Sequence, residues 1–138
     1  MSDSPHPNAV ILSANWYGAD TDGRGRGLFA SRAFEAGSLI GMFAGLALSA
    51  REVDALKGTR VYDYVFYVRA APEFGPDAFD ASLALGAISL CNHSPRANAR
   101  FDVREGGLWI ALHAGRIIAP HEEITIDYED FVHFEVAE

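Results

Sequence analysis

Turn-forming residues interrupt this sequence at short intervals, and their spacing is the strongest constraint on its fold. Glycine-rich, proline-rich or polar clusters separate the apolar runs at residues 23–27, 35–37, 70–77 and 105–107. Isolated turn signals such as Gly58 divide the longer intervals further, so turn signals recur about every eight to twelve residues and the apolar runs suit strands better than long helices. The sequence therefore predicts a mostly β domain of several small sheets with one or two short helices.

Individual elements follow from local patterns. Ser49 and Glu52 form a capping-box pattern, and Gly58 is a plausible end for the short helix that it would start. Residues 79–92 are expected to be part extended and part helical turn. The remaining runs are expected as strands: an apolar stretch from residue 10 and, after the glycine-rich turn, residues 38–45, 61–68, a hairpin of 97–103 with 108–113, and 123–128.

Length and composition limit the class of protein. The chain of 138 residues is 49% hydrophobic, which suits one domain at residues 10–138 behind a loose tail at residues 1–9. Its single cysteine rules out a disulfide framework and a cysteine-rich zinc cluster. No signal peptide and no apolar run of membrane-spanning length is recognisable, so we expect a cytoplasmic protein without a membrane partner.

The net charge of −8 argues against direct nucleic-acid binding, which needs a positive surface. It favours a cationic partner, although an acidic chain can also simply be more soluble.

The polar triplet Asn92-His93-Ser94 follows an apolar approach and is costly to bury unless its hydrogen bonds are satisfied. It matches a glycosylation sequon, but a secretory context is missing. Cys91 with His93 could ligate a metal, yet a metal site needs more ligands than these two. Ser94 sits in no nucleophile elbow, so a Ser–His triad is poorly supported.

Two further features carry candidate chemistry. Gly23, Gly25 and Gly27 alternate with arginines, so the backbone could approach a ligand closely, although a flexible hairpin loop is the simpler interpretation. Tyr128 ends an alternating segment in which Ile126 and Tyr128 share one face. A tyrosine there is commonly a half-buried core residue with a hydrated hydroxyl.

Taken together, five segments resemble the SET-domain protein lysine methyltransferases. They are GRGLFA (25–30), DYVF (63–66), FDA (79–81), NHSPRAN (92–98) and EEITIDY, which ends at Tyr128. The resemblance covers about residues 10–128. It implies the β-clip fold of small sheets, with a C-terminal pseudoknot where the last segment passes under the NHS loop.

The resemblance also implies an activity. The chain would use S-adenosylmethionine, without a metal, to methylate a lysine side chain of a basic, histone or histone-like protein. The catalytic residues would be Tyr128 and Tyr64. The cofactor would contact Gly25, Arg26, Gly27, Tyr64, Asn92, His93 and Phe131, and the substrate channel would be lined by Phe43, Tyr64, Ile126, Tyr128 and Phe134.

The chain departs from the family pattern in several places. Ser89-Leu90-Cys91 replaces the usual Arg-Phe-Ile, so Arg24 or Arg26 would have to substitute for a cofactor-binding arginine. Phe43 stands where a tyrosine is usual, and Ile126 where an aromatic residue is common. A wider, less polar channel would favour di- or trimethylation.

Two other functions remain open. A catalytically silent SET domain could bind basic peptides, which the loss of the arginine at Ser89 would favour. The protein could also be an acidic, β-rich binder of a carbohydrate or small ligand. In that case the similarity of the five segments to the SET family would be coincidental. The sequence does not identify the substrate protein or the oligomeric state.

Overall fold

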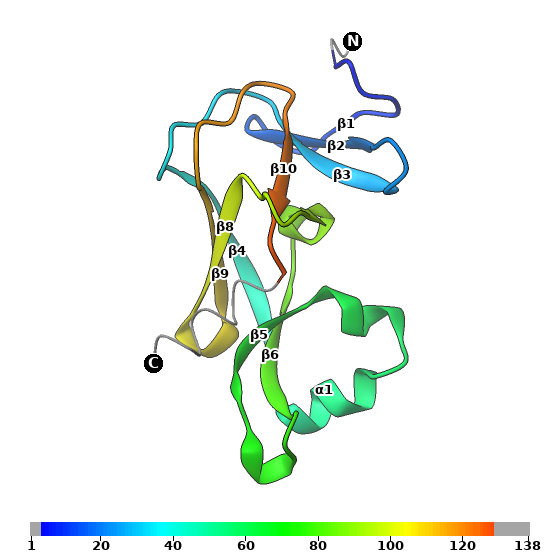
Figure 1. Cartoon of the computed structure of the whole chain (residues 1–138), viewed down its shortest axis with the longest axis vertical. Helices are drawn as coiled ribbons and strands as arrows, with labels where there is room; N and C mark the ends of the chain where they lie inside the picture. Colours follow the sequence, from blue (N-terminus) through cyan, green and yellow to red (C-terminus); the bar gives the residue numbers. More distant parts are fainter. Residues whose placement is uncertain (1–3, 129–138) are drawn as a thin grey trace. The chain divides into compact units, whose positions relative to one another are not determined.

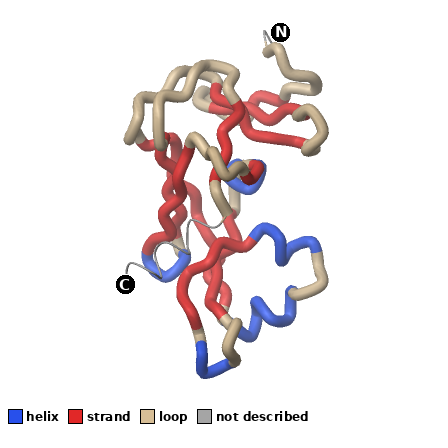
Figure 2. Tube along the Cα trace, viewed as in Figure 1, coloured by secondary structure: helices blue, strands red, loops and turns tan. Residues whose placement is uncertain are grey.

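The computed structural model describes residues 4–128, and strands make up most of its regular structure (Figure 2). Among these residues there is one α-helix, α1 (Ala50–Leu56), and the mostly β architecture of small sheets is confirmed. The strands are β1 (Val10–Ile11), β2 (Trp16–Asp20), β3 (Arg26–Ala30), β4 (Leu39–Leu48), β5 (Val65–Ala70), β6 (Phe79–Ala84), β7 (Asn92–His93), β8 (Ala99–Arg104), β9 (Trp109–Ala114) and β10 (Glu123–Ile126). Short 3-10 helices are η1 (Arg60–Tyr64), η2 (Pro72–Phe74), η3 (Ala87–Leu90) and η4 (Glu105–Gly107).

The chain forms two compact units. The first comprises Met1–Gly41, Leu90–Phe101 and Leu112–Glu138, and the second comprises Met42–Ser89 and Asp102–Ala111. Within residues 4–128, no helix has the length and apolar character that crossing a membrane requires.

The first unit contains a five-stranded sheet in the order β1-β2-β3-β10-β7 (Figure 1). β2 and β3 form an antiparallel hairpin around the glycine-rich turn, and β10 pairs antiparallel with β3, with Ile124 opposite Leu28. β7 pairs parallel with β10, with Thr125 opposite Asn92. The chain therefore brings the NHS segment beside its C-terminal strand, whereas the pseudoknot itself stays a prediction.

The core of the first unit is apolar and closely packed. Its fully buried large side chains include Leu28, Phe34, Ile118, Ile124 and Ile126. Burying each such side chain contributes about 1.5–3 kcal/mol to the free energy of unfolding.

Residues 4–9, expected within a loose tail, bond to this unit. The His6 ring stacks on Phe29 with centroids 3.9 Å apart, and its Nε2 lies 2.8 Å from the His121 carbonyl oxygen. The Asp20 amide donates to the Pro7 carbonyl. The domain boundary at residue 10 stays a prediction.

The second unit is organised around the sheet β5-β6-β4-β9-β8, in which β4, β8 and β9 continue into residues of the first unit. The β5–β6 hairpin has a register shift between Tyr67 and Arg69, and β4 pairs with β6 from Gly45 opposite Ala84.

Helix α1 starts as the capping box predicts. The Ser49 side chain accepts from the Glu52 amide, and the Glu52 side chain accepts from the Ser49 amide. Asp80, from the FDA segment, adds a second anchor: one carboxylate oxygen accepts from the Ala50 amide at 2.8 Å and the other pairs with Arg69 at 3.0 Å. Asp80 therefore joins α1, β5 and β6.

Two strand predictions need correction. Residues 61–64 form part of η1, and the strand begins only at Val65. The side chains of Val61 and Tyr64 are exposed, and a β-branched or aromatic residue favours a strand mainly when a sheet surface is there to pack on. The last strand stops at Ile126, because the Tyr128 amide donates to the His93 ring at 3.0 Å and not to a backbone ladder.

Gly45 offers a test of packing in the second unit. A Cβ atom at this position would lie 2.2 Å from Ser82 Oγ and 2.4 Å from the Gly107 carbonyl oxygen. We expect Gly45→Ala to lower the free energy of unfolding by about 1–3 kcal/mol, measured by urea denaturation. Adding Ser82→Ala should not restore stability, because the backbone oxygen of Gly107 still blocks the site. A fully stable double variant would contradict this packing.

Candidate functional site

Strand pairing and side-chain bonds join three segments of the first unit: the turn before β3, residues 92–98, and β10. The turn is built by Thr21, whose amide and hydroxyl both donate to the Gly25 carbonyl at 2.7 Å. Gly25 has φ +72°, a conformation that L side chains rarely adopt. The glycine is therefore required by the turn.

Asn98 joins residues 92–98 to β10 through its buried side chain, which is only 2% exposed. Its Oδ1 accepts from the Thr125 amide at 2.9 Å, and its Nδ2 donates to the Glu123 carbonyl at 2.7 Å. The Asn98 amide also donates to Thr125 Oγ1 at 3.3 Å. The side chain thus imitates a strand partner and satisfies backbone groups that would otherwise be buried unpaired.

Asn92 joins β7 to the glycine-rich turn. Its Nδ2 donates to the Arg26 carbonyl at 3.0 Å and to Glu123 Oε2 at 2.8 Å. The Asn92 side chain that donates both bonds is only partly buried. Asn92 therefore holds the surface turn in place and does not belong to the buried core.

The two arginines of the turn differ in their surroundings. Arg24 forms an ion pair with Glu123. The Arg26 side chain is exposed, and its guanidinium makes no hydrogen bond or ion pair within residues 4–128. Of the two predicted substitutes for the missing arginine, Arg26 is the one whose charge is not already paired.

His93 and Tyr128 are in direct contact. Their ring centroids are 5.0 Å apart, and the Tyr128 amide donates to His93 Nδ1 at 3.0 Å. The Asp127 carboxylate lies 3.6 Å from the same ring nitrogen, so the imidazole has a backbone amide and a carboxylate on its Nδ1 side.

The Tyr128 side chain is 49% exposed, and its hydroxyl donates to the Cys91 carbonyl oxygen at 3.0 Å. This bond gives the phenol a defined position although the residue lies beyond the end of β10. The Cys91 thiol is buried, and burial, with the nearby Glu123 carboxylate, strongly raises its pKa. The thiol therefore stays protonated, which removes Cys91 as a nucleophile or thiolate ligand.

Glu122 secures the turn that leads into β10. Burial raises the pKa of this carboxyl, but the Ala119 amide, the Asn98 side chain and Arg116 outweigh it, so the pKa is lowered overall. Its bonds from the Ala119 amide (2.9 Å) and Arg116 (3.0 Å) show that it is a structural carboxylate.

The other predicted site residues do not all belong to this unit. The structure groups Gly25, Arg26, Gly27, Asn92, His93, Ile126 and Tyr128 within the first unit, with Ile126 only 1% exposed. Phe43 and Tyr64 belong to the second unit, where Phe43 is buried against Gly86 and Tyr64 is 47% exposed at the end of η1. Phe131 and Phe134 lie outside the described residues.

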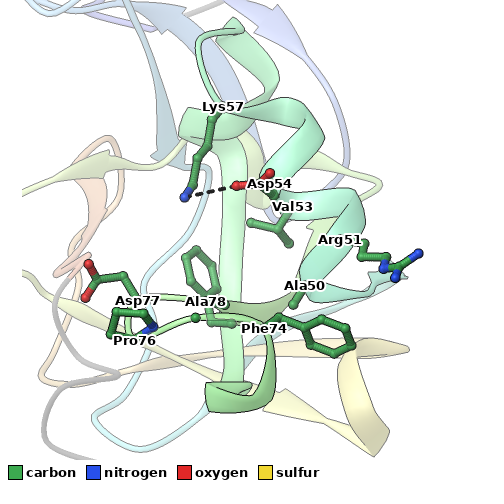
Figure 3. Close-up of a pocket in the computed structure, with 11 residues that line it drawn as sticks. Ala50, Arg51, Val53, Asp54, Lys57, Phe74, Pro76, Asp77 and Ala78 are labelled. Carbon is green, nitrogen blue, oxygen red and sulfur yellow. Dashed lines mark ion pairs between the residues drawn. The ribbon is translucent and has the colours of Figure 1, made fainter.

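The second unit also has a cavity of about 350 Å³ between α1 and the loop before β6 (Figure 3). Its lining includes Val53 from α1, Lys57 directly after it, Phe74 at the end of η2 and Pro76 from the following loop, and none of the predicted site residues. Across residues 4–128, no three His, Cys, Asp or Glu side chains are grouped so that they could hold a metal ion.

Comparison with known proteins identifies the class to which this fold and site belong. The profile of the SET domain matches residues 25–129, which is most of the chain. The chain therefore belongs to the SET-domain family, and the resemblance inferred from the five segments is confirmed.

Solved structures show the same fold. One is PFL0690c of Plasmodium falciparum, which is provisionally described as a histone methyltransferase. It superposes with a TM-score of 0.64 at 20% sequence identity, and the match covers 85% of this chain and 95% of that chain. Another is DIM-5 of Neurospora, a histone lysine methyltransferase, with a TM-score of 0.63, 21% sequence identity and 80% of this chain covered. This chain spans half of the DIM-5 chain. No curated protein sequence matches it significantly.

Sequence reasoning missed three groups at this place. Asn98 was recognised only as part of a motif, Glu123 only as the start of a strand, and the Cys91 carbonyl not at all. A buried polar residue between apolar neighbours is a usable signal for Asn98, since such a residue must find partners. No local signal identifies a backbone carbonyl as a partner for Tyr128.

The contrast between the two asparagines can be tested. Asn98→Ala leaves the buried Thr125 amide without its partner, so we expect the free energy of unfolding to fall by about 1–3 kcal/mol. Asn92→Ala, which removes partly exposed bonds, should cost clearly less than Asn98→Ala, about 0.5–1 kcal/mol, and, as the resemblance implies, should weaken S-adenosylmethionine binding. Urea denaturation of both variants measures the difference. Equal losses of stability would show that Asn98 does not have this role.

Proposed function

We propose that the protein is an S-adenosylmethionine-dependent protein-lysine N-methyltransferase that acts on a basic, lysine-containing protein. The observation that carries the proposal is the hydroxyl of the half-exposed Tyr128, held by the Cys91 carbonyl next to Asn92 and His93. This hydroxyl is a positioned polar group within the residues that match the SET domain.

The residues around the glycine-rich turn fit the cofactor. A Cβ atom at Gly25 would meet nothing within 4 Å, so the backbone there is open to a ligand. The exposed Arg26 guanidinium suits a carboxylate, and Asn92 and His93 bring polar main chain to the same edge. When bound, S-adenosylmethionine supplies an electrophilic methyl group on a sulfonium.

Tyr128 would orient the lysine amine. Its hydroxyl donates its hydrogen to Cys91, and a hydroxyl acting as donor serves a second partner as an acceptor. Its oxygen would thus accept an N–H of the amine, and the Cys91 carbonyl would reinforce the same negative potential. Such groups stabilise the positive charge that develops on the amine as the transfer proceeds.

The amine must also be neutral to react, although a free lysine has a pKa of about 10.4. Desolvation among apolar walls favours the neutral form. We propose Phe43, Tyr64, Ile126 and Phe134 as such walls, with Tyr64 as a second catalytic group and Phe131 as a cofactor contact. The net charge of −8 suits a basic substrate, such as a histone or histone-like protein.

A catalytically silent SET domain that binds basic peptides is the second candidate. Ser89 favours it, because the Ser89 hydroxyl donates to the Ala84 carbonyl within its own turn and cannot replace an arginine. Titration calorimetry with S-adenosylmethionine separates the two candidates: the enzyme binds the cofactor, and the silent module binds basic peptide alone.

Tyr128→Phe removes one hydroxyl and tests the proposed catalytic role. We expect roughly a ten- to thousandfold loss of kcat, with cofactor affinity retained. Methyl transfer to a histone-derived peptide and calorimetry measure the two quantities. Tyr62→Phe removes one hydroxyl from a tyrosine in η1; it is the matched control and should leave kcat unchanged. Full activity of Tyr128→Phe would overturn the assignment.

Ile126 bears on how many methyl groups are added. It lacks the hydroxyl that could hold a water molecule beside the amine, so we expect dimethyl- or trimethyl-lysine from the wild type. Ile126→Tyr enlarges a buried side chain, so it should also lower the free energy of unfolding by about 1–3 kcal/mol, measured by urea denaturation. The variant that remains folded should shift the product toward monomethyl-lysine, as read by mass spectrometry of a single-lysine peptide after long reaction. A wild-type reaction that stops at one methyl group contradicts this proposal.

A further inference from the structure

We infer that Glu123 is a positioning residue for the cofactor site, acting through Arg24 and Asn92 on the backbone of the glycine-rich turn. The inference rests on the proposed function, because the turn is the part of the site that would receive the cofactor. It assigns to Glu123 a role that the reaction chemistry alone does not require.

The carboxylate of Glu123 connects all three segments of the site. It lies at the first residue of β10, pairs with Arg24 of the turn through Oε1, and accepts from Asn92 of β7 through Oε2 at 2.8 Å. The same Asn92 amide donates to the Arg26 carbonyl at 3.0 Å. A continuous chain of bonds therefore runs from β10 through Asn92 to the turn backbone.

The burial of this carboxylate makes the connection effective. The Glu123 side chain is only 14% exposed, whereas that of Arg24 is 49% exposed. A carboxylate largely removed from water needs polar partners, and here the Arg24 guanidinium and the Asn92 amide each bond to one of its oxygens. The carboxylate therefore fixes both partners relative to β10.

The backbone at Gly27 lies close to the Glu123–Asn92 contact. A Cβ atom there would lie 2.7 Å from Glu123 Oε2, 2.7 Å from Thr21 Cγ2 and 3.1 Å from Asn92 Nδ2. Gly27 has no positive φ, so its lack of a side chain serves packing and not the turn conformation. The space that a side chain would fill is occupied by the carboxylate–amide contact.

A consequence follows for the two arginines. Because Glu123 holds Arg24, the turn keeps a fixed conformation in which the neighbouring Arg26 remains exposed. Arg24 would then set the position of the turn, and Arg26 would meet the carboxylate of the ligand. Loss of Glu123 should weaken cofactor binding more than the transfer step, since the Glu123 carboxylate bonds to Arg24 and Asn92, whereas the Tyr128 hydroxyl bonds to the Cys91 carbonyl.

Glu123→Gln tests the inference, since the amide keeps the size of the side chain but loses its charge. We expect the dissociation constant for S-adenosylmethionine, from calorimetry, to rise roughly ten- to a hundredfold. At saturating cofactor, kcat should stay within about twofold. In the absence of cofactor, amide hydrogen exchange of residues 24–27 should become faster. Asp102→Asn, which removes a similar charge from an exposed ion pair in the second unit, is the control.

Arg24→Gln removes the other partner of the same ion pair. Because the Arg24 side chain is half exposed, this variant should remain folded. It should raise the dissociation constant as Glu123→Gln does, and the double variant should be no weaker than the worse single variant, because both act through one chain of bonds. If the wild type binds the cofactor and these variants bind it equally well, the inference is wrong and the proposed function stands. If the wild type does not bind it, the proposed function fails, and unchanged hydrogen exchange in the variants would then refute the role of Glu123 separately.

Discussion

The pairing of β7 with β10 is the interaction on which the rest of the first unit depends. A parallel ladder of two residues is too short to be stable by itself, yet here it joins segments about thirty residues apart in sequence. Asn98 reinforces the ladder, because its side-chain amide bonds to the backbone of Thr125, the first paired residue of β10, and of Glu123, two residues earlier. β10 thereby gains a partner on each side, which allows Ile124 and Ile126 to be completely buried.

This arrangement separates buried residues that hold the segments together from exposed residues that a ligand can reach. The holding groups, such as Asn98 and Glu123, are buried or nearly so and have their hydrogen bonds satisfied within the unit. Tyr128 and Arg26 are exposed at the ends of strands that these groups fix. An exposed group at the end of a fixed strand can meet a ligand at little conformational cost, since its backbone is already ordered.

The features that sequence reasoning predicted correctly depend on nearby residues. The start of α1 follows from Ser49 and Glu52, three positions apart, and the hairpins follow from glycine-rich turns. The errors lie where distant parts of the chain decide the outcome. The run 61–64 has the composition of a strand but no sheet neighbour, and Asn98 and Glu123 reveal their roles only once β10 lies beside residues 92–98. Such pairings depend on tertiary contacts that composition and spacing do not encode.

The effect of each departure from the family pattern depends on whether the contact that it changes is made by the backbone or by a side chain. Tyr128 is held by the carbonyl of Cys91, a group that any residue at that position would present, so the replacement of Arg-Phe-Ile by Ser89-Leu90-Cys91 leaves this contact intact. The arginine of the family pattern is different, because its positive charge belongs to the side chain and Ser89 carries none. Arg24 of the turn is already paired with Glu123, whereas the exposed Arg26 pairs with no carboxylate within residues 4–128. Under the proposed function, the replacement therefore bears on cofactor affinity, through Arg26, more than on the position of Tyr128.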